Sequence, residues 1–411
     1  MTKHPPLTVF EHQTLKVGQI VNDVVFERKH FEALEKFYGN GVPYFGLIHD
    51  GVKFNEFVGA LQVGRLTIEV LPKADKSNDD QLWRGILLGM LRKVGGFDIH
   101  APSSSHLNLK SNSILDLYFE LFVAEVEGLL HRGLVKQYRK SEGNLPMLKG
   151  SIQFSKHIRA NVIHKERFYV KYTVYDHHHD LNLILYKTIK LIQRISSNSA
   201  LSSRLGALLL NFPEVADCRI TPELFSKITF NRKTEGYKNA ISISKLLLLN
   251  YHPDVQRGTQ DVLAIMFDMN LLWERFVYKS LYRYSEGKLI QAQSSKYFWK
   301  PESGSRVKMR PDIVSNDNKE DCIVLDTKWK NLNGLNPSPE DLRQMYVYSS
   351  YYKASKAYLV YPAAEDATTD GVFYNELGDV TDRACGVISI STLKNITEWQ
   401  KKIAKRINAI D

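Results

Sequence analysis

The chain has 411 residues, of which 43% are hydrophobic and 24% charged, and its formal net charge is +10 at pH 7. This length exceeds one ordinary core, so we expect two or three domains, and the apolar content argues against general disorder. The excess of basic residues favours an acidic partner, nucleic acid first. No apolar run approaches the ~20 residues that a membrane-spanning helix needs, so we expect no membrane partner. The absence of an apolar signal-peptide core and of a CxxC pair favours a reducing, cytoplasmic location.

Residues 1–105 predict a β-rich amino-terminal domain. Short apolar runs such as YFGLIH, FVGALQVG and RLTIEVLP alternate with Gly, Asn and Asp, which is typical of strands and turns. The exception is the segment SNDDQLWRGILLGMLRKVGGF, whose pattern predicts a helix that ends at Gly95-Gly96.

Residues 106–255 predict a largely helical middle region, which is a candidate for docking a partner. Apolar residues at helical spacing predict a long helix from Ser113 to Tyr138 and two shorter helices over 181–196 and 200–211. Between them, residues 132–171 hold ten Lys or Arg against two Glu. This basic tract is either a solvated face or an arm that touches nucleic acid or a protein partner.

Residues 256–411 predict the final domain. We interpret its opening run, DVLAIMFDMNLLWERFVYKSLYRY, as one helix, and several strand-like runs follow it. A second helix should begin at Pro339 with Ser338 as its N-cap, and a basic amphipathic helix, STLKNITEWQKKIAKRINAI, should close the domain. The predicted fold class for the whole chain is α+β and multidomain.

The stretch RPDIVSNDNKEDCIVLDTKWK, residues 310–330, has the pattern of a β-hairpin. Two apolar runs flank the polar segment SNDNKED, which is typical of a turn. Pairing about that turn brings Asp312 and Asp326 near each other, with Lys328 alongside. Two adjacent carboxylates repel each other, and a divalent cation removes that conflict. Mg²⁺ takes oxygen ligands and keeps waters that can attack phosphorus, so the hairpin indicates metal-assisted phosphoester chemistry.

The strand faces that carry the two aspartates also carry basic side chains. Residues two apart in a strand share a face. A continuous first strand therefore places three cations beside Asp312, and the second strand places one beside Asp326. These four candidates for contacts with DNA phosphates are Arg306, Lys308, Arg310 and Lys330.

Two polar residues on predicted helices are candidates to join this site. Glu274 falls on an apolar stripe of MNLLWERFVYKSL, where a carboxylate is costly without a partner. Gln344 lies on the helix PEDLRQMYVYSSYY, on one face with Tyr348 and Tyr351. Each also has a purely structural interpretation, Glu274 as a snorkelling or salt-bridged residue and Gln344 as an exposed one.

The order of acidic helix, PD strand, DxK strand and glutamine-bearing helix resembles the PD-(D/E)xK nuclease superfamily over roughly residues 260–360. The resemblance implies a carboxy-terminal α/β domain of the restriction-endonuclease type. It implies Asp312 and Asp326 as ligands of Mg²⁺, for which Mn²⁺ is a possible substitute, and Lys328 as the catalytic lysine. Glu274 would be the helix-borne acid and a further metal ligand, and Gln344 the polar residue of the later helix.

Three other segments resemble McrC proteins: GRLTIEVLPK at 64–73, NLPMLKGSIQF at 144–154 and YTVYDHHHDLNLILYKTIK at 172–190. The McrC family implies the DNA endonuclease subunit of a modification-dependent, type IV restriction system. It also implies that the non-nuclease part docks on an McrB-like AAA+ GTPase hexamer and stimulates it. This sequence has no GxxxxGK[ST] loop, so another chain would hydrolyse the nucleotide. Two alternatives remain, a stand-alone PD-(D/E)xK nuclease and a non-cleaving DNA-binding adaptor or activator of an ATPase ring.

Overall fold

The computed structural model divides the chain into two compact units, each described here by itself. One unit comprises Ser105–Pro253 with Met1–Lys3, and the other joins His4–Ser104 to Asp254–Asp411. The larger unit thus contains residues from both the first and the third segments of the chain that the sequence analysis separates. The structure describes residues 6–74, 79–94, 113–196, 198–213, 220–252, 261–285, 288–317, 321–330, 332, 336–354 and 356–410.

The smaller unit has a helical part, as expected. Ser113 caps the first long helix of this unit by accepting a hydrogen bond from Asp116 N. That helix ends at Arg132, whereas the sequence predicted an end at Tyr138. Gly133 follows with φ +87°, a conformation that favours glycine and turns the chain out of the helix. The helices are α3 (Ile114–Arg132), α5 (Asp180–Ile195), α6 (Ser199–Asn211), α7 (Pro222–Ser226) and α8 (Lys238–Leu249).

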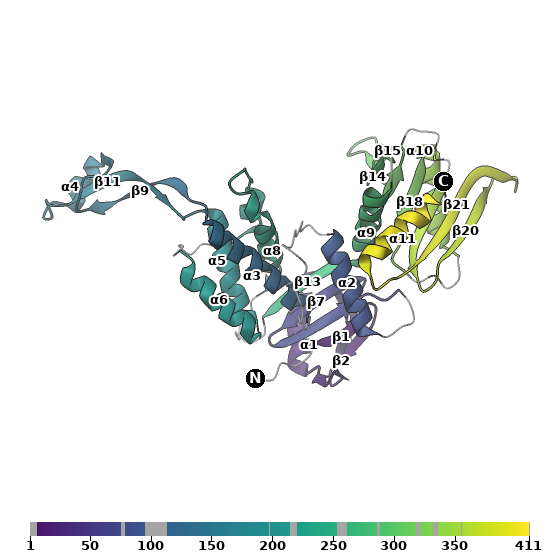
Figure 1. The fold of residues 1–411 in the computed structure, drawn as a ribbon, viewed down its shortest axis with the longest axis horizontal. Helices are drawn as coiled ribbons and strands as arrows, with labels where there is room; N and C mark the ends of the chain where they lie inside the picture. The colour runs from purple at the N-terminus through teal and green to yellow at the C-terminus, as the bar shows by residue number, and fades with distance from the viewer. Residues whose placement is uncertain are drawn as a thin grey trace. The chain divides into compact units, whose positions relative to one another are not determined.

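The basic tract of this unit forms a β-ribbon, so the prediction of a largely helical middle region was wrong there. β9 (Gln137–Leu145) pairs antiparallel with β11 (Phe168–Asp176) along its whole length. The short β10 (Ser151–Ile152) and α4 (Phe154–Ala160) lie between them in sequence. Alternating exposed and half-buried side chains give β9 the period of a strand, which a count of charges does not reveal. We call residues 137–176 the arm (Figure 1).

The amino-terminal part of the larger unit is β-rich, as expected. β1 (Leu7–Phe10) runs parallel to β8 (Leu66–Leu71), which pairs antiparallel with β7 (Phe57–Val63). A buried core of aliphatic and aromatic side chains lies beneath this sheet and α1 (Arg28–Tyr38). The remaining elements are β2 (Thr14–Lys16), β3 (Ile20–Val21), β4 (Val24–Val25), β5 (Phe45–Ile48), β6 (Gly51–Phe54) and α2 (Asp80–Val94). The predicted helix stop at Gly95-Gly96 lies outside the described residues.

The run interpreted as one helix from Asp261 is a strand followed by a helix. β13 (Val262–Asp268) pairs antiparallel with β7, and α9 (Met269–Tyr284) begins directly after it. The side chain of Asp268 caps α9 by accepting a hydrogen bond from Leu271 N at 3.1 Å. An uninterrupted apolar run such as VLAIMF suits a buried strand as well as a helix, and its partner strand lies far away in sequence. β13 therefore adds a strand from the later part of the chain to the amino-terminal sheet, directly before α9.

The carboxy-terminal part of the larger unit contains a mixed six-stranded sheet in the order β14-β17-β18-β19-β21-β20. β17 and β18 form the expected hairpin, and β18, β19 and β21 run parallel. α10 (Pro339–Tyr352) connects β18 to β19 and packs on one face, and α9 and α11 (Ile396–Asn408) pack on the other (Figure 1). The strands are β14 (Ile290–Ala292), β17 (Ile313–Ser315), β18 (Ile323–Thr327), β19 (Lys356–Ala363), β20 (Ala367–Tyr374) and β21 (Val380–Ser391).

The predicted start of the helix at Pro339 is confirmed, and the closing amphipathic helix is present but begins at Ile396 and ends at Asn408. Ser338 caps α10 by accepting a hydrogen bond from Asp341 N, and Pro339 occupies the first turn. The closing amphipathic helix is α11, capped by Asn395. In the described part of the chain, no helix has both the length and the apolar character that crossing a bilayer requires.

Four tryptophans form a cluster in the larger unit. Trp273 of α9 has its ring centroid 5.6 Å from that of Trp329 and 5.4 Å from that of Trp399 on α11. Trp83 of α2 lies edge-on to Trp329 at 6.4 Å. Large aromatic side chains contribute strongly to cores through buried area and edge-to-face contacts. The cluster therefore holds the segment just after β18 in a fixed position.

A buried carboxylate completes this cluster. Trp329 Nε1 donates a hydrogen bond of 2.7 Å to Glu11 Oε1, which also accepts one of 2.8 Å from Lys73 N. Burial is the main reason that the pKa of Glu11 rises to about 7, and the charge of Glu56 adds to the effect. The folded protein therefore keeps a proton on Glu11 that the unfolded chain releases near its ordinary pKa.

We predict that Glu11→Gln removes part of the pH dependence of stability. Because the folded state binds the proton more tightly, the stabilisation is complete below the unfolded pKa and is lost as pH rises through about 7. The wild-type free energy of unfolding should thus fall by about 3 kcal/mol from this group alone between pH 4.5 and 8. Glutamine keeps the acceptor for Trp329 and does not ionise.

Urea unfolding followed by tryptophan fluorescence across this pH range measures the effect. Glu35→Gln on the exposed face of α1 is the matched control and should follow the wild-type curve. Identical slopes for wild type and Glu11→Gln would contradict the prediction.

Candidate active site

The hairpin register places the two predicted aspartates opposite each other. Ile313 pairs with Leu325, so the next pair toward the open end of the hairpin is Asp312 and Asp326. Asp312 Oδ2 accepts two hydrogen bonds from Thr327, one from N at 2.7 Å and one from Oγ1 at 2.8 Å. The structure therefore brings both carboxylates together, as predicted from the sequence.

Lys328 lies beside this pair. Its Nζ is 2.8 Å from Asp326 Oδ2 and 4.0 Å from Asp341 Oδ1 on α10. It also donates a 3.4 Å hydrogen bond to Gln344 Oε1. Lys328 N donates to Val360 O at 3.0 Å, which fixes its backbone against β19. The predicted lysine and the predicted glutamine thus belong to the same cluster as the aspartates.

Burial and mutual repulsion set the electrostatics of the cluster. Burial and then the charge of Asp312 raise the pKa of Asp326 to about 6, against the opposing effect of Lys328. Burial also raises the pKa of Asp312, although hydrogen bonds from Thr327 oppose the rise. Burial lowers the pKa of Lys328, but Asp326, Asp312 and Asp341 outweigh it and the net pKa is raised. Lys328 is therefore charged at neutral pH, and the aspartates favour a cation.

Gln344 links the lysine to the first strand segment. Its Nε2 donates a 2.8 Å hydrogen bond to the hydroxyl of Tyr348, which donates to Arg310 O at 3.2 Å. This chain of hydrogen bonds ties α10 to the residues that precede Asp312. A side chain held at both ends orients its partner, so Gln344 is suited to position Lys328.

Glu274 lies near the pair but is separately bonded. Burial and then the charge of Asp312 raise its pKa, which places its carboxylate within electrostatic reach of the site. Its Oε1 accepts a 2.8 Å hydrogen bond from Gln293 Nε2. Among the described residues, no three His, Cys, Asp or Glu side chains are arranged as a ready metal-binding group. The Glu274 carboxylate therefore lies near the aspartate pair without forming a three-carboxylate group with it.

Thr327 and Asp341 belong to the site although neither was singled out from the sequence. Thr327 lies between Asp326 and Lys328 in the sequence. The alternation of side chains along a strand therefore predicts that it points to the face opposite these two residues. Asp341 looked like an ordinary acid of a first helical turn, but it binds Lys330 Nζ at 2.5 Å. The charge of Lys330 and the capping Ser338 outweigh burial and lower its pKa. Only the packing of α10 over β18 reveals this role.

The four predicted DNA-contacting residues do not share one strand face. The chain from Arg306 to Asp312 is not one strand, because β16 (Val307–Met309) ends before Arg310-Pro311 and pairs with β15 (Lys296–Trp299) in a separate ribbon. Proline has no N–H for a ladder, which is consistent with the break. Arg306 and Lys308 lie on this ribbon, Arg310 is exposed between ribbon and hairpin, and Lys330 binds Asp341.

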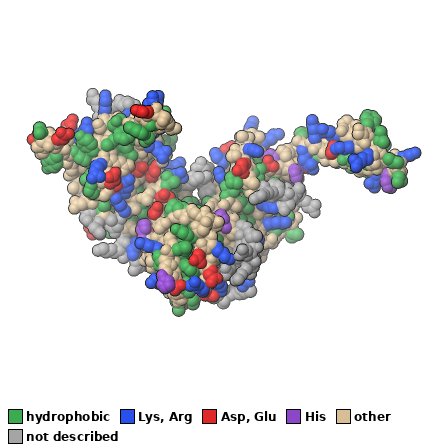
Figure 2. All heavy atoms as spheres, turned by 180° about the vertical axis from the view of Figure 1, so that it is seen from behind, with side chains coloured by type: hydrophobic (Ala, Val, Ile, Leu, Met, Phe, Trp, Pro, Cys, Tyr) green, Lys and Arg blue, Asp and Glu red, His purple; other side chains and the backbone are tan. Residues whose placement is uncertain are grey.

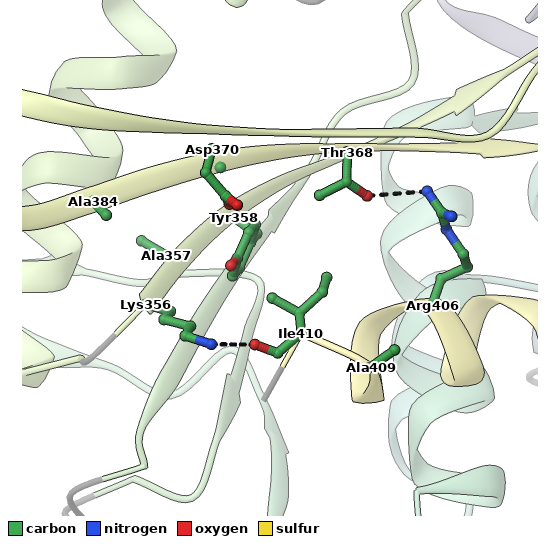
Figure 3. A pocket seen from close by; sticks show the side chains of 10 residues that line it. Lys356, Ala357, Tyr358, Thr368, Asp370, Ala384, Arg406, Ala409 and Ile410 are labelled. Carbon is green, nitrogen blue, oxygen red and sulfur yellow. Dashed lines mark hydrogen bonds between the residues drawn. The ribbon is translucent and has the colours of Figure 1, made fainter.

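A pocket of about 520 Å³ lies elsewhere in the same sheet, between β19, β20, β21 and the end of α11 (Figure 3). Gly386 makes room there for the ring of Tyr358, because a Cβ at that position would lie 2.2 Å from Tyr358 Cε1. Lys356 donates to the carbonyl of Ile410, and Arg406 donates to Thr368 Oγ1 at 3.0 Å. None of the predicted site residues lines this pocket.

Comparisons with known proteins agree with the sequence resemblance. The curated protein that matches is the type IV methyl-directed restriction enzyme EcoKMcrBC of Escherichia coli strain K12, 24% identical over 233 residues. That match covers 54% of this chain and 66% of the relative, so the chain spans just under two thirds of its length.

Two solved assemblies share the fold. One is the refined half-complex from the tetradecameric assembly of Thermococcus gammatolerans McrB AAA+ hexamers with bound McrC, with a TM-score of 0.75 and 20% identity over 99% of this chain and 100% of that chain. The other is the McrBC complex of the same organism, with a TM-score of 0.52 and 19% identity over 68% and 87% of the two chains. The profile of the family described as McrBC 5-methylcytosine restriction system component matches residues 52–362, well over half of the sequence. The chain belongs to this McrBC family.

Proposed function

We propose that this chain is the DNA-cleaving, McrC-like subunit of a modification-dependent restriction system and hydrolyses phosphodiesters at a PD-(D/E)xK site. The observation that carries the proposal is the pairing of half-buried Asp312 with buried Asp326, with Lys328 Nζ 2.8 Å from Asp326 Oδ2. Family membership and the fold shared with an McrC-containing assembly support it. The likeness to EcoKMcrBC supports DNA as the substrate.

The donor set fits Mg²⁺. Hard divalent cations take carboxylate oxygens, and Mg²⁺ is commonly held by one or two carboxylates and several waters. Asp312 and Asp326 would hold the ion. Glu274, whose carboxylate interacts electrostatically with Asp312, would be a further ligand, directly or through water. When bound, the ion would lower the pKa of a water and stabilise charge on the phosphate, and Mn²⁺ could replace it. A site that binds a cation holds carboxylates whose charge is unfavourable until the cation neutralises it. The raised pKa values of both aspartates agree with such a site.

The remaining residues hold charge in place. Lys328 presents an ammonium next to the carboxylates, where it can stabilise negative charge on the scissile phosphate. Gln344 and Asp341 fix its position from α10, and the buried Trp329 fixes its backbone from the other side. Arg310 lies within electrostatic reach of Asp312 and is exposed to a ligand.

The arm is the docking surface that we propose for an McrB-like AAA+ GTPase hexamer. Beyond the last ribbon pair, Leu145 with Phe168, the chain exposes large apolar side chains that include Phe154 at 70% and Ile163 at 85%. Lys and Arg side chains lie both along the ribbon and among these apolar residues at the tip (Figure 2). Contiguous exposed apolar residues with a polar surround are typical of protein–protein contacts. Docking would order catalytic residues of the ring, because this chain has no phosphate-binding loop of its own.

We predict that Asp326→Ala abolishes DNA cleavage and leaves the fold and the ring-docking activity intact. The substitution removes one of two carboxylates that hold the metal, and it also relieves their repulsion in the buried pair. Cleavage of methylated DNA in Mg²⁺ and in EDTA, with the partner ring present, measures the loss. Glu365→Ala, an exposed acid between β19 and β20, is the control and should cut normally. Normal cutting by folded Asp326→Ala would exclude Asp326 from the site.

We predict that metal affinity falls as pH decreases through about 6. Burial and the charge of Asp312 raise the pKa of Asp326, so below that pH the metal must displace a proton. Each displaced proton lowers the affinity about tenfold per pH unit. Mn²⁺ titration followed by electron paramagnetic resonance at pH 5, 6 and 7.5 measures this, and Asp326→Asn should bind weakly with a flatter profile. Equal affinities at pH 5 and 7.5 in the wild type would contradict this account.

We predict that the paired substitutions Phe154→Ser and Ile163→Ser reduce stimulation of GTP hydrolysis by the ring. These changes remove apolar surface at the tip of the arm without touching the aspartate pair. Hydrolysis is measured with the partner ring and the full-length chain. Leu210→Ser on α6 is the matched control, since that leucine is 88% exposed in the same unit. Full stimulation by the tip variant would place docking elsewhere.

A further inference from the structure

A two-stranded ribbon projects from the candidate active site. β15 and β16 pair antiparallel, with Tyr297 opposite Lys308. Gln293, just before β15, donates its N–H to Asp312 O at 2.8 Å and its side-chain amide to Glu274. At the other strand, β16 leads through Arg310-Pro311 directly into Asp312. Both ends of the ribbon are therefore fixed at the carboxylate pair.

One face of β15 packs against α10. Phe298 lies 5.6 Å from Tyr351 in an edge-on contact, and Lys296 Nζ lies 4.0 Å from the ring centre of Tyr352. The Tyr352 hydroxyl donates a 2.8 Å hydrogen bond to Ser294 O. These contacts fix the ribbon's orientation relative to the helix that carries Gln344.

The other face of β15 is exposed and carries aromatic and basic groups. Tyr297 is 57% exposed and pairs with Lys308, and Trp299, also 57% exposed, pairs with Val307 beyond a β-bulge. Arg306 and Lys308 both lie over the Tyr297 ring, at 5.1 Å and 5.0 Å from its centre. Cation–π contacts at exposed sites contribute roughly 0.5–1 kcal/mol each, enough to restrict two flexible cations. Tyr297 thus pre-organises a pair of positive charges on one face of the ribbon.

The charge of the ribbon identifies the class of its partner. The sequence KYFWKPESGSRVKMR, residues 296–310, contains five basic residues and one acidic residue. A two-stranded ribbon fits the major groove of B-DNA, and basic side chains on it can reach phosphates on both sides. An apolar protein partner could pack against Trp299 alone, and the excess basic charge would not strengthen that contact.

We propose that the ribbon Lys296–Met309 is a duplex-contacting element that positions DNA on one side of the scissile phosphate. Arg306 and Lys308 bind backbone phosphates, Tyr297 holds these two cations in place, and Trp299 packs against the groove wall. The inference rests on the proposed nuclease function and specifies how its substrate is held. These side chains act as positioning residues, since none of them touches the aspartate pair.

The test compares full-length variants for DNA binding and cutting. Binding of a fluorescent duplex is measured in the cleavage-deficient Asp326→Ala background across a salt series. Arg306→Gln with Lys308→Gln should raise Kd on the order of tenfold and reduce the salt slope by about two units, one per lost phosphate contact. Trp299→Ala should weaken binding with an unchanged slope. Tyr297→Leu should weaken it and Tyr297→Phe should not, because phenylalanine keeps the ring.

Lys16→Gln with Lys53→Gln provides a control of equal charge on exposed positions of β2 and β6. This variant should bind DNA as the wild type does. If the ribbon variant also binds with unchanged Kd and slope while Asp326→Ala abolishes cutting, the ribbon proposal fails and the nuclease proposal stands. If the ribbon variant binds DNA normally but no longer stimulates the GTPase ring, the ribbon contacts a protein instead. If Asp326→Ala still cuts DNA, the nuclease proposal itself fails.

Discussion

The repulsion between two adjacent carboxylates, one buried and one half-buried, determines the rest of this site. Asp312 and Asp326 meet on paired strands, and burial opposes the charge of both. The fold tolerates this because Thr327 donates twice to one carboxylate and Lys328 pairs with the other. Such an arrangement is costly for stability alone, since apolar residues would fill the same space more favourably. The cation and the phosphate that we propose as ligands account for such a pair in a hairpin beside exposed basic residues.

The position of Lys328 depends on the amino-terminal part of the chain. Its neighbour Trp329 packs against Trp273 and donates a hydrogen bond to Glu11, which lies at the other end of the sequence. β13 reinforces this connection, because it belongs to the amino-terminal sheet and leads directly into α9. The part of the chain that carries the aspartate pair is therefore packed on the first hundred residues rather than connected to them only by a linker. This explains why the larger unit is discontinuous in sequence.

Local signals in the sequence were sufficient for some parts of the fold and insufficient for others. The hairpin about SNDNKED and the start of α10 at Pro339 follow from turn and capping preferences, so they could be predicted. The strand Val262–Asp268 could not, because an apolar run becomes a strand only where β7 is available to pair with it. Pro311 is a local signal for the break between β16 and β17, but the alternation of charges from Arg306 to Asp312 suggested one continuous strand. Hydrogen bonds to Glu11 and from Thr327 depend on packing and leave no short-range pattern.

The net charge of the chain divides between surfaces of different chemistry. The tip of the arm combines large exposed apolar residues such as Ile163 with basic side chains, a composition that suits a protein surface. The ribbon holds Arg306 and Lys308 on an aromatic ring beside the carboxylate pair, which suits phosphates. Composition alone reports the sum of these charges and points to nucleic acid for all of them. The structure separates them, because basic charge next to a carboxylate pair and basic charge among exposed apolar side chains favour different ligands.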